Sequence, residues 1–166
     1  MLRCDVLIIG SGLAGLTSAL KLAGHKKVLI VSKREILDSS SQWAQGGVAA
    51  VMSNEDSIES HVKDTEFVGG GLTDPKVANF VASHGKEAIE WLHDLQVPFS
   101  LDETTQQFHL TKEGGHSHRR VVHAKDATGR AIQATLSEQV KAHANITILE
   151  NHIAVDLITE KKSLKV

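Results

Sequence analysis

Cys-Asp-Val-Leu-Ile-Ile-Gly-Ser-Gly-Leu-Ala-Gly, residues 4–15, is the most informative stretch of the chain. The apolar run 6–9, headed by Cys4, predicts a β-strand that is buried on both faces. Residues 13–23 then predict a helix that ends at Gly24. A strand and a helix joined by a glycine-rich turn indicate the first half of a βαβ unit.

Three glycines in this turn, Gly10, Gly12 and Gly15, fit the pattern G-x-G-x-x-G. The first allows a tight turn, the second lets a pyrophosphate approach the backbone, and the third lets helix and strand pack closely. Free N–H groups and the helix dipole favour phosphate at the start of the helix. An ordinary strand–turn–helix without a ligand is the alternative. The glycine pattern, however, directly follows a predicted strand and opens a predicted helix, as it does in dinucleotide-binding sites. The expected contacts are Gly10, Ser11, Gly12, Leu13, Ala14 and Gly15.

A second buried strand is predicted over residues 27–31, parallel to the first. An acidic residue at its end would bind the adenosine ribose, but this chain has Ser32, Lys33 and Arg34 there. The two cations favour a 2′-phosphate and hence NADP. Ser32 could still bond a ribose hydroxyl, and Lys33 could lie over the adenosine end of any dinucleotide. The motif therefore predicts the class of ligand and leaves its identity open.

Small residues and paired glycines dominate residues 38–50. Such a run offers backbone donors and can press against a flat ligand. A flexible Ser-rich linker is the alternative, and Trp43 and the apolar residues 48–51 argue against it. The residues expected to contact the ligand are Ser40, Ser41, Gln42, Trp43, Ala44, Gln45, Gly46 and Gly47.

The middle of the chain predicts two helices and a hairpin. Residues 56–67 have the apolar spacing of an amphipathic helix. Asp74 and Pro75 predict the start of another helix, which Gly85 interrupts. Residues 97–110 predict a hairpin or an irregular extended segment.

The last part of the chain returns to strands. Thr128 is expected to cap a helix that runs to about His143, and residues 146–149 predict a third strand of the parallel sheet. Apolar and polar residues alternate over 153–159, which predicts an antiparallel strand that opens a β-meander. Residues 160–166 would form a turn and the beginning of a returning strand. Because an unpaired half-strand leaves an exposed edge, we expect the chain to be part of a longer protein.

Residues 111–120 form a second unusual stretch, rich in histidine and arginine. His116, His118 and His123 suggest a metal site, but no cysteine or acidic triad completes one, so no metal is expected. We interpret the stretch as a polar, partly cationic loop for a small anionic substrate, with Glu113 as its negative member. A solvated charged turn is the alternative.

Composition excludes several classes of function. The 166 residues carry 18 basic and 20 acidic side chains, a formal charge of −2, which does not favour nucleic acid or an anionic membrane as a partner. No apolar run approaches the ~20 residues of a membrane span. The single cysteine cannot form an internal disulfide, and the first strand begins too early to leave room for a signal peptide. A cytoplasmic location is expected.

The whole chain resembles the N-terminal part of the L-aspartate oxidases, within the succinate dehydrogenase/fumarate reductase flavoprotein family. The glycine-rich turn is shared by many flavoproteins, and Ser32-Lys33 replaces the usual acid as it does in these oxidases, which favours FAD over NADP. The other matching stretches are residues 44–50 (Ala-Gln-Gly-Gly-Val-Ala-Ala), residues 113–120 (Glu-Gly-Gly-His-Ser-His-Arg-Arg), His123-Ala124 and residues 126–130 (Asp-Ala-Thr-Gly-Arg).

The resemblance implies an α/β, Rossmann-like FAD-binding domain with a parallel sheet and a β-meander, incomplete at its C-terminus. It places FAD contacts on residues 11–14, on Lys33, on residues 40–47 and near Ile153 and Ala154. Membrane-bound relatives bond the flavin to a histidine at the position of Ser40. A hydroxyl cannot replace imidazole in that bond, so FAD is expected to be held non-covalently.

Glu113 matches the glutamate that orients the substrate's α-ammonium group in these oxidases. A carboxylate suits this role because it forms charge-assisted hydrogen bonds with a cation. The implied reaction oxidises L-aspartate to iminoaspartate by hydride transfer from Cα to flavin N5, and oxygen or fumarate then reoxidises the flavin. The imine feeds quinolinate formation in NAD biosynthesis, with quinolinate synthase as a candidate partner.

Three parts are expected within the chain: a dinucleotide-binding unit and flavin loop over 1–50, a helical insertion with the substrate-side loop over 51–125, and a helix, strand and meander over 126–166. The resemblance places further substrate-binding residues beyond this chain, so we expect it to be inactive alone. The alternatives are a fumarate reductase or succinate dehydrogenase flavoprotein subunit, and a non-catalytic NADP-binding module.

Overall fold

A computed structural model describes residues 2–125 and 127–159. The chain divides into two compact units, and each is described by itself. The first lies within Met1–Ser41 and Leu136–Val166, and the second comprises Gln42–Thr135.

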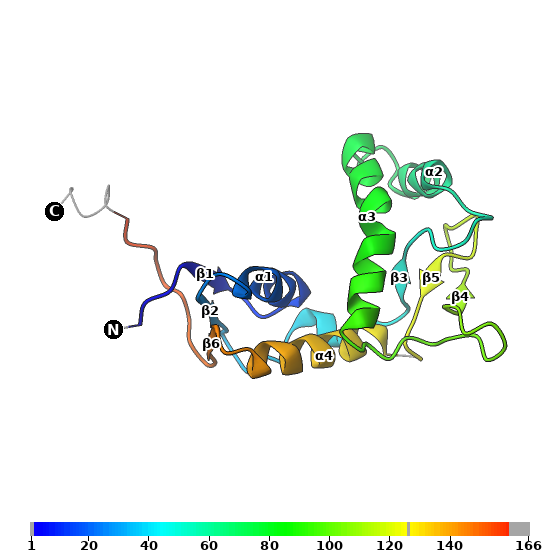
Figure 1. Cartoon of the computed structure of the whole chain (residues 1–166). Coiled ribbons are helices and arrows are strands. Elements are labelled where there is room, and N and C mark those ends of the chain that lie inside the picture. The colour runs from blue at the N-terminus through cyan, green and yellow to red at the C-terminus, as the bar shows by residue number, and fades with distance from the viewer. Residues whose placement is uncertain (1, 126, 160–166) are drawn as a thin grey trace. The chain divides into compact units, whose positions relative to one another are not determined.

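Three parallel strands, one complete helix and the last part of another form the first unit (Figure 1). The sheet has the order β1-β2-β6, so the strand that comes last in the chain lies next to β2. Its elements are β1 (Val6–Ile9), α1 (Leu13–Ala23), β2 (Val28–Val31) and β6 (Ile146–Leu149). The predicted strand–helix–strand unit and its third parallel strand are confirmed.

Strand β2 is the centre of this sheet, since Val28 lies opposite both Val6 and Ile146. Val28 and Ile30 are buried, and so is Leu16 of α1. These side chains form an apolar core between the sheet and the helix, which holds the glycine turn between β1 and α1 in place.

The prediction that β1 is buried on both faces is wrong. Leu7 and Ile9 are 43% and 56% exposed, while Val6 and Ile8 are partly buried. Exposed and partly buried residues alternate along β1, so one face of the strand is covered and the other, which carries Leu7 and Ile9, is not covered within the described residues. Cys4, expected at the head of a buried strand, precedes β1 and is exposed.

The second unit combines two complete helices and the first part of a third with a small antiparallel sheet (Figure 1). The strand order is β3-β5-β4, with Val122 opposite both Val48 and Leu110. A short 3₁₀ helix over Ser40–Trp43 leads into this unit along the chain, and α4 contributes residues to both units. The elements are β3 (Val48–Ala49), α2 (Ile58–Val68), α3 (Pro75–Asp94), β4 (Leu110–Thr111), β5 (Val121–Val122) and α4 (Thr128–Ala142).

Helix α3 begins as predicted. The Asp74 carboxylate accepts hydrogen bonds from the N–H groups of Lys76 and Val77, and Pro75 occupies the first turn. The predicted interruption at Gly85 is wrong, because the helix continues through it. A Cβ at Gly85 would lie 3.3 Å from the Cβ of Ala50, so glycine here allows close packing on the segment after β3.

Helix α2 also differs in part from its prediction. It begins at Ile58, and the Ser57 hydroxyl oxygen caps it by accepting a hydrogen bond from the Ser60 N–H group. Phe67, an apolar position of the predicted stripe, is 87% exposed, whereas His61 is the buried residue of the helix. The predicted hairpin over 97–110 is confirmed in outline by the antiparallel bridge between Leu101 and Phe108.

The predicted strand over residues 153–159 is absent, although all seven of these residues are described. A strand needs a neighbour for its backbone N–H and C=O groups, and no described segment pairs with this one. The β-meander is therefore not seen. Its predicted turn and returning strand over 160–166 lie outside the described residues. Among the described helices none is long and apolar enough to cross a bilayer.

Candidate functional site

The glycine turn after β1 has the close geometry that the motif predicts. Gly10 has φ +112°, a conformation that side-chain-bearing residues rarely adopt, and its N–H group donates to the Val31 carbonyl at 2.9 Å. A Cβ at Gly15 would collide with the Gly10 carbonyl oxygen. Both glycines are thus required to bring the start of α1 against the end of β1.

The N-terminus of α1 is open to a ligand group. Gly12 is its N-cap, and no side chain caps the helix. The N–H groups of the first turn therefore suit a phosphate, which is attracted by the helix dipole. A Cβ at Gly12 would lie 3.8 Å from the Ser41 hydroxyl oxygen, so Ser41 borders the same turn. This cradle fits the diphosphate of a dinucleotide.

The end of β2 adjoins this turn. The hydroxyl groups of Ser32 and Ser11 are hydrogen-bonded at 2.8 Å, and both residues are buried. Lys33 is exposed. Arg34 is one of the two cations that favour NADP. Its guanidinium group forms an ion pair with the Asp38 carboxylate at 3.0 Å, which offsets its positive charge.

Ile153 and Ala154 follow β6 on the same unit. The N–H group of His152 donates to the Ser32 carbonyl at 2.9 Å, which holds the chain beside the end of β2. Ile153 is 67% exposed and Ala154 is exposed as well. The bond places the residue before Ile153 beside Ser32, and the contact of Ile153 and Ala154 with the adenosine end of a ligand stays a prediction.

The small-residue loop lies mainly in the second unit, where α4 and β5 hold it. The Ala44 carbonyl accepts from the Gly129 N–H group at 3.2 Å, and the Gly46 carbonyl accepts from the Thr128 hydroxyl at 2.6 Å. A Cβ at Gly47 would collide with the Val122 carbonyl oxygen of β5. These contacts fix the backbone of the small-residue loop. Four of its residues are exposed, namely Trp43, Ala44, Gln45 and Gly46.

Thr128 does more than the predicted cap. It is the first residue of α4, and its hydroxyl oxygen accepts a hydrogen bond from the Ala124 N–H group at 3.0 Å. The same hydroxyl donates to the Gly46 carbonyl. This buried side chain therefore connects the loop to the segment after β5.

Glu113 lies beside this loop. A Cβ at Gly46 would be 3.2 Å from Oε1 of Glu113 and 3.4 Å from Oε2. Glu113 is exposed and follows β4 in the connection between β4 and β5. The structure thus brings together the predicted substrate-binding carboxylate and the predicted flavin loop within one unit.

Arg120 is a residue whose role the sequence does not reveal. It is fully buried, and its Nε and Nη2 atoms donate to the two carboxylate oxygens of Asp56 at 2.7 Å each. Its Nη1 atom donates to Asp64 at 2.7 Å. The loop therefore presents less positive charge than its sequence predicts, because the carboxylates of Asp56 and Asp64 neutralise the Arg120 guanidinium group inside the unit.

These ion pairs change the acidity of the carboxyl groups. Burial raises the pKa of Asp64, but hydrogen bonds from Ser117 and Arg120 outweigh burial and lower it to about 2. Burial also raises the pKa of Asp56, and the Arg120 and Ser57 hydrogen bonds bring it below its usual value. For His61, burial and the Arg120 charge lower the pKa. Arg120 therefore faces two ionised carboxylates at neutral pH.

Arg120 is 64 residues away from Asp56 and 56 residues away from Asp64 in the sequence. No local sequence pattern therefore predicts these two ion pairs. By contrast, Thr128 lies in one of the stretches that carry the family resemblance, so its importance was indicated, although its contacts were not.

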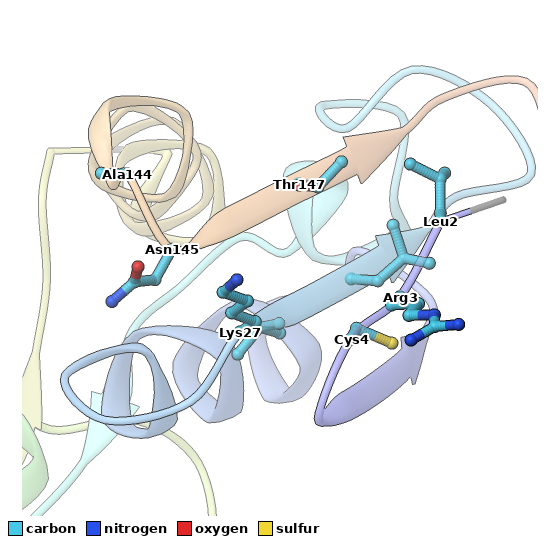
Figure 2. A pocket seen from close by; sticks show the side chains of 9 residues that line it. Leu2, Arg3, Cys4, Lys27, Ala144, Asn145 and Thr147 are labelled. Atoms are coloured by element: carbon cyan, nitrogen blue, oxygen red, sulfur yellow. The ribbon is translucent and has the colours of Figure 1, made fainter.

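A pocket of about 100 Å³ lies at the other end of the parallel sheet (Figure 2). It is lined by Cys4, Lys27 and Asn145, which precede β1, β2 and β6 respectively, together with neighbouring residues. Ligands of open α/β sheets bind at the carboxyl ends of the strands. This pocket at the amino ends is therefore separate from the predicted dinucleotide site.

Comparison with known proteins gives the same family as the motifs. A family described as FAD binding domain matches residues 5–166. L-aspartate oxidase 1 of Ralstonia nicotianae is 52% identical, with 95% of this chain and 30% of that protein covered. L-aspartate oxidase of Vibrio cholerae is 51% identical, with 96% of this chain and 31% of that protein covered. The chain thus spans about 30% of the length of these curated relatives.

The fold has a solved counterpart. A structure of E. coli quinol fumarate reductase FrdA has a TM-score of 0.89 and 28% identity, with 96% of this chain and 28% of that chain covered. These findings confirm the predicted resemblance, the α/β FAD-binding fold and FAD as the cofactor.

Proposed function

Because this chain belongs to the family of FAD binding domains, we propose that it is the cofactor-binding portion of an FAD-dependent L-aspartate oxidase. The observation that carries the proposal is the place of Glu113 beside Gly46, in a chain about half identical to L-aspartate oxidases. A carboxylate at the flavin loop is suited to an amino-acid substrate.

Three sets of residues would hold FAD. The open N-terminus of α1, with Gly12 and Ser41 beside it, suits the diphosphate. Ser32, Lys33 and the segment at Ile153 suit the adenosine end. The loop of residues 42–47, in which residues 43–46 are exposed, suits the flavin ring. Ser40 cannot form the covalent bond of the membrane-bound relatives. FAD is therefore held non-covalently in this proposal.

Glu113 is the proposed catalytic residue of the chain. Aspartate differs from succinate by an ammonium group on the carbon that is oxidised, and a nearby carboxylate orients that cation. When bound, FAD would supply the redox chemistry, a hydride acceptor for Cα; with loss of a proton from the amino group, the product would be iminoaspartate. The proposed role of Glu113 is to bind the ammonium group and thereby place Cα for oxidation.

The wider role follows from the product. Oxygen or fumarate is the proposed acceptor of the two electrons, and iminoaspartate is the proposed precursor of quinolinate in NAD biosynthesis. Iminoaspartate hydrolyses readily in water, so transfer to quinolinate synthase as a partner is part of the proposal. We also propose a cytoplasmic location, and a division of this portion into residues 1–50, 51–125 and 126–166 as described above.

Anaerobic reduction of the full-length protein tests the function. Addition of L-aspartate should bleach the flavin absorbance, and succinate at the same concentration should not. Denaturation with acid should release all of the flavin. Bleaching by neither compound would refute the proposal.

The second candidate is a fumarate reductase flavoprotein subunit, favoured by the structural similarity to quinol fumarate reductase. It predicts bleaching by succinate that equals or exceeds bleaching by L-aspartate. Glu113 argues against it, because succinate has no cation for this carboxylate to bind. Flavin that stayed attached after denaturation would also favour the second candidate.

A further inference from the structure

The loop of residues 112–119, which carries Glu113, is anchored on helix α2 by the Asp64 carboxylate and by the Ser60 hydroxyl, which lies 3.0 Å from Ser117 Oγ and 3.1 Å from His118 Nδ1. Oδ2 of Asp64 accepts hydrogen bonds from both the N–H and the hydroxyl group of Ser117, each at 2.7 Å. A bond to a backbone N–H group fixes the main chain of the loop, not only a side chain. Asp64 therefore determines where this part of the loop lies.

The Asp64 carboxylate is itself held. Nη1 of Arg120 donates to the same oxygen, Oδ2, at 2.7 Å, while the rest of the guanidinium group binds both oxygens of Asp56. Charge-assisted bonds of this length are stronger than neutral ones. Because Arg120 is fully buried, its planar group acts as a rigid support for Asp64.

The short path from Ser117 back to Glu113 is also constrained. The His116 N–H group donates to the Glu113 carbonyl at 3.2 Å, which closes a turn. Gly115 has φ +85°, and a Cβ there would lie 2.7 Å from a methyl group of Val68 at the end of α2. Because residues 113–117 are constrained in this way, a displacement of Ser117 also displaces Glu113.

Removal of the Asp64 carboxylate would leave the buried charge of Arg120 paired with that of Asp56. Arg120 keeps its bidentate pair with Asp56, so no buried charge loses its only partner. The Asp64 side chain is 19% exposed, whereas Arg120 and Asp56 are 0% and 1% exposed. The carboxylate that anchors the loop is thus separable from the pair that stabilises the interior.

We propose that Asp64 is a positioning residue, whose carboxylate fixes the loop of residues 112–119 and thereby aligns Glu113 with the substrate's ammonium group. The proposal rests on the proposed function of Glu113. It assigns the Asp64–Arg120 pair to substrate selection, in addition to its contribution to folding.

The test compares three variants of the full-length protein. Asp64→Ala removes the acceptor for Ser117, Asp64→Asn keeps an oxygen that can accept from it, and Glu59→Ala is the control, an exposed acid on the same helix. Misplacement of Glu113 should lower kcat/KM for L-aspartate by about 10- to 100-fold in Asp64→Ala. FAD content and fumarate reduction should stay at wild-type values. Asp64→Asn should recover most of the loss, and Glu59→Ala should show none.

Hydrogen exchange of the amides of residues 112–119 is the second measurement. Exchange should become faster in Asp64→Ala and stay unchanged in Glu59→Ala. Wild-type kcat/KM and unchanged exchange in Asp64→Ala would overturn the proposal, as would loss of FAD in parallel with activity. If the wild-type protein does not oxidise L-aspartate, the proposed function fails, while the exchange data still decide whether Asp64 holds the loop.

Discussion

The Glu113 carboxylate lies against Gly46, close enough that a Cβ on Gly46 would be 3.2 Å from Oε1. Gly46 has φ +80°, and its carbonyl is bound by the Thr128 hydroxyl. The backbone of the small-residue loop is thus fixed on one side by α4 and bordered on the other by this carboxylate. Only glycine satisfies both the backbone conformation and the space.

Gly46→Ala in the full-length protein should raise KM for L-aspartate. The added methyl group displaces the Glu113 carboxylate, and the left-handed conformation costs about 1–2 kcal/mol for a residue with a Cβ. Steady-state kinetics and FAD titration measure both effects. Gly114→Ala is the matched control, since a Cβ there meets nothing within 4 Å, and equal effects of the two variants would contradict the prediction.

Gly15→Ala should weaken FAD binding. A Cβ at Gly15 collides with the Gly10 carbonyl oxygen, so the start of α1 must move away from β1 and the diphosphate cradle is lost. Overpacking of this kind typically costs about 1–3 kcal/mol. Gly24→Ala, at the other end of α1, is the control because its Cβ meets nothing within 4 Å and its φ is −59°. FAD affinity and thermal stability should fall in the first variant only.

Thr128→Val should destabilise the protein by about 1–3 kcal/mol, because the change leaves the Ala124 N–H and Gly46 carbonyl groups without their buried partner. Valine has almost the shape of threonine, so packing is preserved. Urea unfolding of the full-length protein gives the change in free energy. Thr128→Ser retains the hydroxyl group and should keep most of the stability. If Thr128→Ser were as unstable as Thr128→Val, the loss of the hydrogen bonds would not be the cause of the destabilisation, which would contradict the prediction.

The stability of the protein should depend on pH through Asp64. Its pKa is lowered from 3.8 to about 2 in the folded state. A depressed pKa contributes stability that is fully present above the unfolded value and is lost as pH falls through the folded value. The difference in unfolding free energy between wild type and Asp64→Asn should therefore be constant above about pH 5 and narrow from about pH 4 towards pH 2. A difference that stayed constant over this range would contradict the assignment.

The parallel sheet and its helix were predictable because the information is local. The apolar run before Gly10, the helix up to Ala23 and the strand over Val28–Val31 each have their own pattern, and all three are confirmed. Asp74 and Pro75 predict the start of α3 for the same reason. The prediction at Gly85 failed because the glycine serves a distant contact with Ala50, which no helical pattern contains.

The site was predictable only as far as the family resemblance extends. Glu113 and the loop that contains Gly46 lie in matching stretches, and the structure brings them together. Arg120 belongs to the same stretch as Glu113, but its carboxylate partners lie far away in the sequence, Asp56 just before α2 and Asp64 on it. Burial of a charge is decided by such partners, so its structural role could not be read from the loop alone.

Kinetics of Glu113→Gln in the full-length protein test the central claim most directly. Glutamine keeps the size of the side chain and removes the charge that would orient the ammonium group. We predict a large loss of kcat/KM for L-aspartate, with FAD content and fumarate reduction close to wild type. Equal losses with L-aspartate and fumarate would contradict the claim that this carboxylate selects an amino-acid substrate.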